Sequence, residues 1–190
     1  MNRVFLLILL IVAAVLALNI PIKTYTIKMP SGNVEVSIGI TDYLLHNINL
    51  LAFQDIQLTS YLLIPSYKAL FEDLRDTINR KLQEGDKDLV YLYTKFRSRY
   101  PYYQLCISYT HSTYVCGTYV LNPDGLELYP SSGASNPTIL LSKEVYTAIL
   151  SSIKAGDYSF ILKTLPKWYR EKKILFYRTS IFELLQTLSE

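Results

Sequence analysis

The sequence predicts an α+β fold, in which an antiparallel sheet of about five strands carries helices on one face. Apolar residues recur at helical spacing in some stretches and alternate with polar residues in others. The two kinds of stretch are grouped along the chain and do not alternate strictly, which is typical of α+β folds. Half of the 190 residues are apolar and 18% are charged, so the chain suits one globular domain with a packed core.

The chain begins with an uncharged apolar stretch, residues 4–18, behind a single arginine, Arg3. The stretch is shorter than the roughly 20 residues that span a bilayer, although residues up to Ile22 extend it. We therefore expect residues 1–22 to be a transmembrane signal anchor or a signal peptide, and Ala17 leaves a cleavage site open. Either alternative makes the membrane a partner. The body of the protein is then extracytoplasmic behind a single-pass N-terminal anchor, or secreted if the segment is cleaved.

A β-rich N-terminal module is expected over residues 23–65. Residues 23–40 predict a β-hairpin, because apolar and polar side chains alternate in their second half and Pro-Ser-Gly-Asn at 30–33 supplies turn chemistry. Residues 42–64 then predict a helix followed by a strand. The remainder, residues 66–190, is the expected α+β domain.

Two consecutive helices open this domain. Apolar residues at helical spacing over 67–82 predict the first helix, which Gly85 ends. Asp86 is placed to cap the second helix. That helix must end near Tyr100, because Pro101 restricts the conformation of the residue before it.

The central part of the domain predicts strands. Residues 104–121 are rich in β-branched and aromatic side chains and predict a hairpin. The sequence Asn-Pro-Asp-Gly at 122–125 predicts a turn, with a short strand at 126–129 and another at 138–141.

The C-terminal part returns to helices. Ser142 is placed to cap a helix that Gly156 ends. Asp157 opens a short helical turn that is expected to stop before Pro166. A strand follows, and Ser180 begins a capping box that opens the final helix.

From residue 66 onward, the order of elements resembles the sterol carrier protein type 2 domain, the nonspecific lipid carrier. The strongest local likeness is TILLSKEVYTAILSSIKAGDYSFILKTLPKWYREKKILFYRTSIFELLQTL, residues 138–188. In that family a strand leads into a capped helix, an AGD-like turn starts the next helix, and a strand with a lysine-rich entry leads into the last one. The resemblance implies an apolar tunnel for acyl chains or sterols, gated by the C-terminal helix, and no catalytic machinery. The N-terminal segment and residues 22–65 depart from the family and have no counterpart in it.

The ligand that the resemblance implies is a lipid or another hydrophobic small molecule, held by apolar side chains of the 66–190 domain. The expected lining residues are Phe71, Leu74, Ile149, Phe160, Leu165, Phe176, Ile181 and Leu185. The same residues packed tightly together form an ordinary core, so both interpretations stay open at this point.

Cys106 and Cys116 flank His111 symmetrically, four residues away on each side. A hairpin that turns around His111 places the two cysteines opposite each other, where a disulfide can form. Two buried free thiols are the alternative, because cysteine is often buried. No metal site is expected, since these three side chains lie on one ribbon without the spacing of a zinc finger.

A basic and aromatic run, Lys167, Trp168, Tyr169 and Arg170, lies between a predicted helix and a predicted strand. We expect a solvated turn here. The second interpretation is contact with a membrane surface, because cations beside aromatic rings suit anionic headgroups. Nucleic acid is not an expected partner, since the net charge is only +3.

No catalytic motif is evident, and the two histidines, His46 and His111, have no acid or nucleophile partner in a motif. We therefore expect neither an enzyme nor a cofactor. The expected function is a membrane-tethered extracytoplasmic domain that binds a lipid or other hydrophobic ligand in an apolar cavity. The alternative is a non-catalytic structural or accessory subunit of a membrane or envelope assembly with a membrane-protein partner, which the many tyrosines suit.

Overall fold

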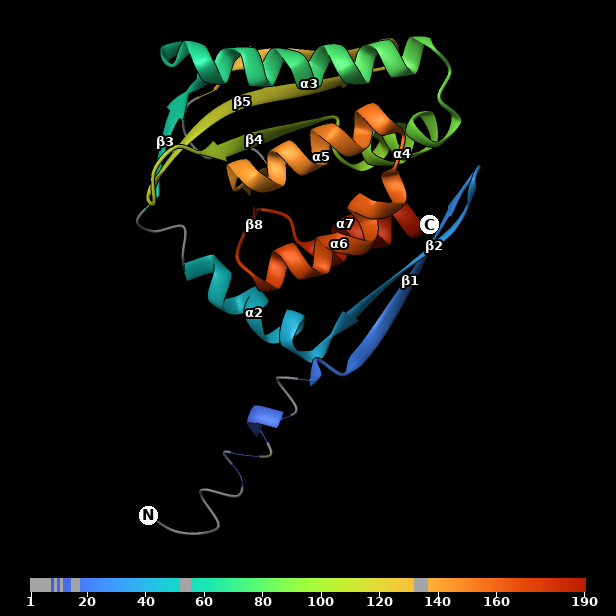
Figure 1. Cartoon of the computed structure of the whole chain (residues 1–190), viewed down its shortest axis with the longest axis vertical. Coiled ribbons are helices and arrows are strands. Elements are labelled where there is room, and N and C mark those ends of the chain that lie inside the picture. Colours follow the sequence, from blue (N-terminus) through green and yellow to red (C-terminus); the bar gives the residue numbers. More distant parts are fainter. Residues whose placement is uncertain (1–7, 9, 11, 15–17, 52–55, 132–136) are drawn as a thin grey trace.

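The computed structural model describes residues 8, 10, 12–14, 18–51, 56–131 and 137–190 (Figure 1). It has an α+β fold with a mixed six-stranded sheet and a separate two-stranded hairpin. The strands are β1 (Pro21–Met29), β2 (Gly32–Gly39), β3 (Gln57–Ser60), β4 (Tyr102–Ser108), β5 (Thr113–Asn122), β6 (Gly125–Pro130), β7 (Thr138–Leu141) and β8 (Ile174–Tyr177). The helices are α2 (Ile40–Leu51), α3 (Pro65–Gln83), α4 (Lys87–Arg99), α5 (Lys143–Ala155), α6 (Tyr158–Arg170) and α7 (Ile181–Ser189), with a short 3₁₀ helix, η1 (Tyr61–Leu63).

The prediction of an antiparallel sheet is wrong. The strand order is β3-β5-β4-β7-β8, and β6 also pairs with β5. β3 runs parallel to β5 and β7 runs parallel to β4, whereas the other neighbouring pairs are antiparallel. Alternating polarity places each side chain on a face of the sheet but does not identify the neighbouring strand. The pattern that predicts β7 therefore gives no sign that β7 lies beside β4 and not beside β6.

The prediction of a membrane anchor is also corrected. Within the described part of the chain, no helix is long and apolar enough to cross a membrane. Strand β1 begins at Pro21, so the apolar stretch that ends at Leu18 does not continue as a helix to Ile22. Residues 1–7, 9, 11 and 15–17 of the expected segment lie outside the described residues. The single-pass anchor, and the extracytoplasmic location inferred from it, are not supported.

The helix boundaries that depend on caps are confirmed. Asp86, Ser142 and Ser180 each accept a hydrogen bond from the backbone N–H three residues further on, at 3.1, 3.2 and 3.1 Å. Gly156 ends α5 with φ 74°, a left-handed conformation that glycine adopts without strain.

Helix α6 is longer than the sequence predicts. It continues through Pro166, the residue expected to stop it, as far as Arg170. A proline inside a helix removes a backbone hydrogen bond and costs about 3 kcal/mol. Trp168 and Tyr169 are both buried on the part of the helix that continues beyond Pro166. Burial of such side chains stabilises the fold by roughly 1.5–3 kcal/mol each, which offsets the cost of the proline.

Helices α3 to α7 lie on one face of the six-stranded sheet, and the β1–β2 hairpin packs beyond them against α6 and α7 (Figure 1). Ile27, Val36 and Ile38 of the hairpin are almost completely buried and belong to the same apolar core as the sheet and its helices. At the tip of the hairpin, the backbone N–H of Ser31 donates to Oδ1 of Asp88 at 2.9 Å. The hairpin thus spans the helical layer from α6 to the start of α4.

A buried polar network fixes the other end of the hairpin. The carboxylate of Asp42, in the first turn of α2, is fully buried. It accepts hydrogen bonds from the backbone N–H of Gly39 at 2.8 Å, from Asn19 at 3.3 Å, and from Nη1 of Arg170, which lies 3.1 Å from both oxygens. The network joins the hairpin and α2 to the C-terminal end of α6.

Candidate functional site

A cavity of about 250 Å³ lies between the sheet and the helices. Its lining side chains on the strands are Tyr103, Leu105, Ile139, Leu141, Ile174 and Phe176. Those on the helices are Leu74, Ile78, Leu89, Leu92, Phe96, Tyr146, Ile149, Ile153, Tyr158, Ile161, Leu162, Leu165, Leu184 and Leu188. The lining is aliphatic and aromatic throughout, and three tyrosine hydroxyls are its only polar side-chain groups among the described residues.

The alternation of the strands explains why the sheet presents this surface. Tyr103 and Leu105 of β4 face the helices, while Gln104 and Cys106 lie on the opposite face. The helices complete the wall because their buried stripes recur every three or four residues, as a helix facing a sheet requires. The same periodicities that form the core therefore form the cavity.

The size of the cavity can be compared with a known case. An engineered apolar cavity of about 150 Å³ holds benzene, so a space of 250 Å³ has room for roughly ten non-hydrogen atoms. A second apolar hollow of about 180 Å³ adjoins the cavity and reaches Tyr93, Leu121 and Leu126. The two spaces share Leu92, Phe96 and other lining residues, so a longer ligand could extend from one into the other.

Buried tyrosine hydroxyls around the cavity donate to defined acceptors. Tyr93 donates to the carbonyl oxygens of Asn122 and Gly125, at 2.9 and 2.7 Å. Tyr146 donates to the carbonyl oxygen of Leu70, and Tyr158 donates to Oδ2 of Asp86. Burial raises the pKa of Tyr93 to about 12 and is also the main cause of the raised pKa values of Tyr146 and Tyr158. These hydroxyls are therefore protonated at neutral pH.

The predicted lining residues fall into two groups. Those that line the cavity are Leu74, Ile149, Leu165 and Phe176. Phe71 is fully buried against the rings of Tyr61 and Tyr119, and Ile181 and Leu185 are fully buried without lining the cavity. Phe160 is 43% exposed and contacts Trp168 edge-on.

Other lining residues were missed by the sequence analysis. Ile139 and Leu141 belong to a predicted strand, but Leu140 between them is apolar and buried as well, so the sequence gives no sign of which of them faces the helices. Leu184 and Leu188 lie on the predicted final helix, one turn apart, next to the positions that the sequence favoured. Helical spacing identifies an apolar stripe, but it does not say which part of that stripe borders an empty space.

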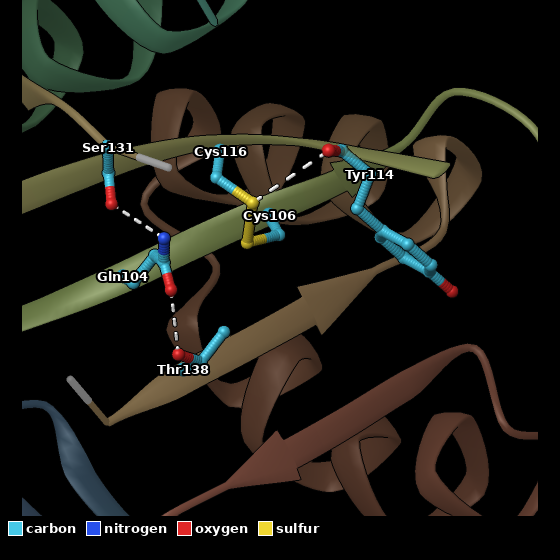
Figure 2. The surroundings of a disulfide bond; sticks show 6 residues. All are labelled: Gln104, Cys106, Tyr114, Cys116, Ser131 and Thr138. Carbon is cyan, nitrogen blue, oxygen red and sulfur yellow. Dashed lines mark hydrogen bonds between the residues drawn. A yellow bond between two sulfur atoms is a disulfide. The ribbon is translucent and has the colours of Figure 1, made fainter. Parts of the chain in front are cut away.

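The predicted disulfide is confirmed. Cys106 of β4 lies directly opposite Cys116 of β5, with a Cα–Cα distance of 4.1 Å, and the two sulfurs are bonded (Figure 2). Both cysteines are fully buried on the sheet face opposite the cavity. Beside them, Gln104 accepts a hydrogen bond from Thr138 at 2.9 Å (Figure 2). The disulfide therefore stabilises the sheet and takes no part in the cavity, and neither sulfur is free to bind zinc.

The basic and aromatic run does not form an exposed surface. Trp168 and Tyr169 are only 6% and 1% exposed, so their rings are part of the core. Arg170 is engaged with the buried Asp42, and Lys167 lies 3.8 Å from Glu171. The aromatic side chains that a headgroup interface needs are therefore inside the fold in this structure.

No family model matches the sequence, and no curated protein matches it.

Proposed function

We propose that this protein binds a small hydrophobic ligand in the cavity between its sheet and its helices. The observation that carries the proposal is an apolar space of about 250 Å³ between the sheet and the helices, which adjoins a second apolar hollow. A ligand that fills this space would remove apolar side-chain surface from water, which stabilises the folded state by about 25 cal/mol per Å² of buried surface.

Binding suits this lining better than catalysis does. Among the described residues that line the cavity there is no histidine, cysteine, carboxylate or cation to act on a ligand. The available driving force is burial of apolar surface, at about 0.8 kcal/mol per methylene group. The resemblance of residues 66–190 to the sterol carrier domain supports the same function, because that family implies an apolar tunnel for lipids.

Native mass spectrometry of the protein purified from its own host tests the proposal. We expect a fraction of the protein to carry an apolar adduct of defined mass, which is lost when the protein is denatured. A protein that is always free of adducts, and that also fails to bind added alkanes or alcohols, would contradict the proposal. If such a protein forms only a multimer, it would point to a structural subunit of an assembly.

A further inference from the structure

One tyrosine of the cavity wall has a hydroxyl that differs from those of its neighbours. Tyr103 of β4 lines the cavity and the adjoining hollow. Its ring packs edge-on against Phe96 at 5.2 Å and stacks on Tyr119 at 5.6 Å. The Tyr103 side chain is half-buried in the wall of the cavity. Burial raises the pKa of its hydroxyl, which fits a group that lies away from bulk water.

The hydroxyls around Tyr103 are all satisfied by the protein. Tyr93 and Tyr146 donate to backbone carbonyls, and Tyr119 donates to the carbonyl oxygen of Phe71 at 2.8 Å. For Tyr103, no hydrogen-bond partner is found among the described residues. A buried hydroxyl without a partner is unfavourable, and a ligand with an oxygen atom would relieve this cost.

The lining also restricts the charge of a ligand. In the described part of the wall there is no lysine or arginine, and Tyr103 is the only unpaired donor. A buried carboxylate without a cation is strongly unfavourable. A carbonyl oxygen needs only one donor, and an uncharged hydroxyl costs far less to bury than a carboxylate. A bound water is a poor substitute, because a buried water typically needs two to four polar partners.

We propose, on the basis of the proposed function, that the ligand is an uncharged hydrophobic molecule with a single hydroxyl or carbonyl oxygen. The Tyr103 hydroxyl donates a hydrogen bond to that oxygen, and the aliphatic wall holds the rest of the molecule. Tyr103 thus determines which chemical class the cavity selects: neutral alcohols or ketones are bound in preference to alkanes and ionised fatty acids.

Three probes of similar size test this selection: nonane, octan-1-ol and octanoate. Their apparent dissociation constants are obtained from the rise of Tm with probe concentration, for the wild type and for Tyr103→Phe. We expect Tyr103→Phe to weaken octan-1-ol binding by about fivefold to tenfold and to leave nonane binding unchanged. Tyr119→Phe is the matched control. It removes a neighbouring hydroxyl that already donates to the carbonyl oxygen of Phe71 and does not line the cavity, so the affinity ratio of octan-1-ol to nonane should stay at the wild-type value.

The outcomes separate the two proposals. If the wild type binds neither nonane nor octan-1-ol, the proposed function fails and this inference fails with it. If both probes bind and Tyr103→Phe affects neither, the cavity is a binding site but the Tyr103 hydroxyl does not select the ligand. If octanoate binds as tightly as octan-1-ol at neutral pH, the restriction to uncharged ligands is wrong.

Discussion

The hydroxyl of Tyr119 donates a 2.8 Å hydrogen bond to the carbonyl oxygen of Phe71, and both side chains are fully buried. This contact joins the central strand β5 to α3. Tyr103 is a neighbour of this contact, because its ring stacks on the ring of Tyr119. The hydroxyl of Tyr103, however, has no acceptor among the described residues. The two neighbouring tyrosines therefore differ in whether the hydroxyl has a hydrogen-bond acceptor, and substitution of each by phenylalanine tests this difference.

The first prediction concerns the stability of these two positions. Tyr119→Phe removes a satisfied buried hydrogen bond and should lower the free energy of unfolding by about 1 kcal/mol. Tyr103→Phe removes an unpaired hydroxyl from the ligand-free protein and should change it by less than about 0.5 kcal/mol, or raise it. Urea unfolding of the two variants measures both values. Equal losses at the two positions would show that the Tyr103 hydroxyl has a partner.

Alkaline pH should destabilise the fold through its buried tyrosines. Burial raises the pKa of Tyr93 from 10.0 to about 12 in the folded protein. A raised pKa means that the folded state holds its proton while the unfolded chain releases it. Stability is therefore fully present below pH 10 and falls as the pH rises towards 12. Urea unfolding at a series of alkaline pH values should show this fall, and it should be smaller in Tyr93→Phe. A stability that rises over this range would contradict the assignment.

The disulfide should contribute substantially to stability. Cys106 and Cys116 are separated by 10 residues, and closing a loop of about this length in the unfolded chain stabilises the folded state by roughly 3 kcal/mol. We expect a variant with both cysteines replaced by alanine to lose about 2–4 kcal/mol in urea unfolding. Wild-type protein in strong reductant should lose a similar amount, whereas the double variant should be insensitive to reductant. A wild type that is equally stable with and without reductant would show that the bond is not formed.

The contact between Arg170 and Asp42 should contribute far more to the free energy of unfolding than the exposed pair of Lys167 and Glu171. Asp42 is fully buried, and Arg170→Met leaves its carboxylate without a cation, which should cost about 3 kcal/mol. Lys167→Met is the matched control on the same helix. It breaks an exposed contact with Glu171 and should cost less than about 1 kcal/mol. Similar losses in the two variants would mean that the Asp42 network does not hold the hairpin to α6.

Local signals in the sequence were sufficient for most helix boundaries. Asp86 and Ser180 cap helices because their side chains reach a backbone N–H three residues away, and that geometry depends on adjacent residues alone. The pairing of Cys106 with Cys116 was also accessible, because a short hairpin sets its own register. These features do not require knowledge of the rest of the fold.

Features that depend on distant packing could not be predicted in the same way. The parallel pairing of β7 with β4 and the continuation of α6 through Pro166 both depend on what lies beside the element in space. The cavity is a further case, because Leu185 and Leu184 are adjacent apolar residues of α7 and only Leu184 borders the space. A periodic pattern identifies residues that become buried on folding, but it does not distinguish a fully packed core from one that contains a cavity.

A larger side chain should be tolerated at a position that lines the cavity but should destabilise the protein at a position in the packed core. Ile149 lines the cavity, so Ile149→Phe has space for the added atoms and should leave the free energy of unfolding unchanged or raised. Ile107 is fully buried and borders none of the described cavities, so Ile107→Phe should overpack the core and cost about 1–3 kcal/mol. Urea unfolding of the two variants makes the comparison. An equal loss in both would indicate that the space near Ile149 is already filled by the protein.

The most direct test of the binding cavity is the affinity of octan-1-ol for the wild type and for Ile149→Phe, measured by isothermal titration calorimetry. We predict that the wild type binds this probe and that Ile149→Phe binds it at least about tenfold more weakly, because the added ring occupies the space of several methylene groups. Equal affinity in the two proteins, or no binding to the wild type, would contradict the conclusion that this cavity is the ligand site.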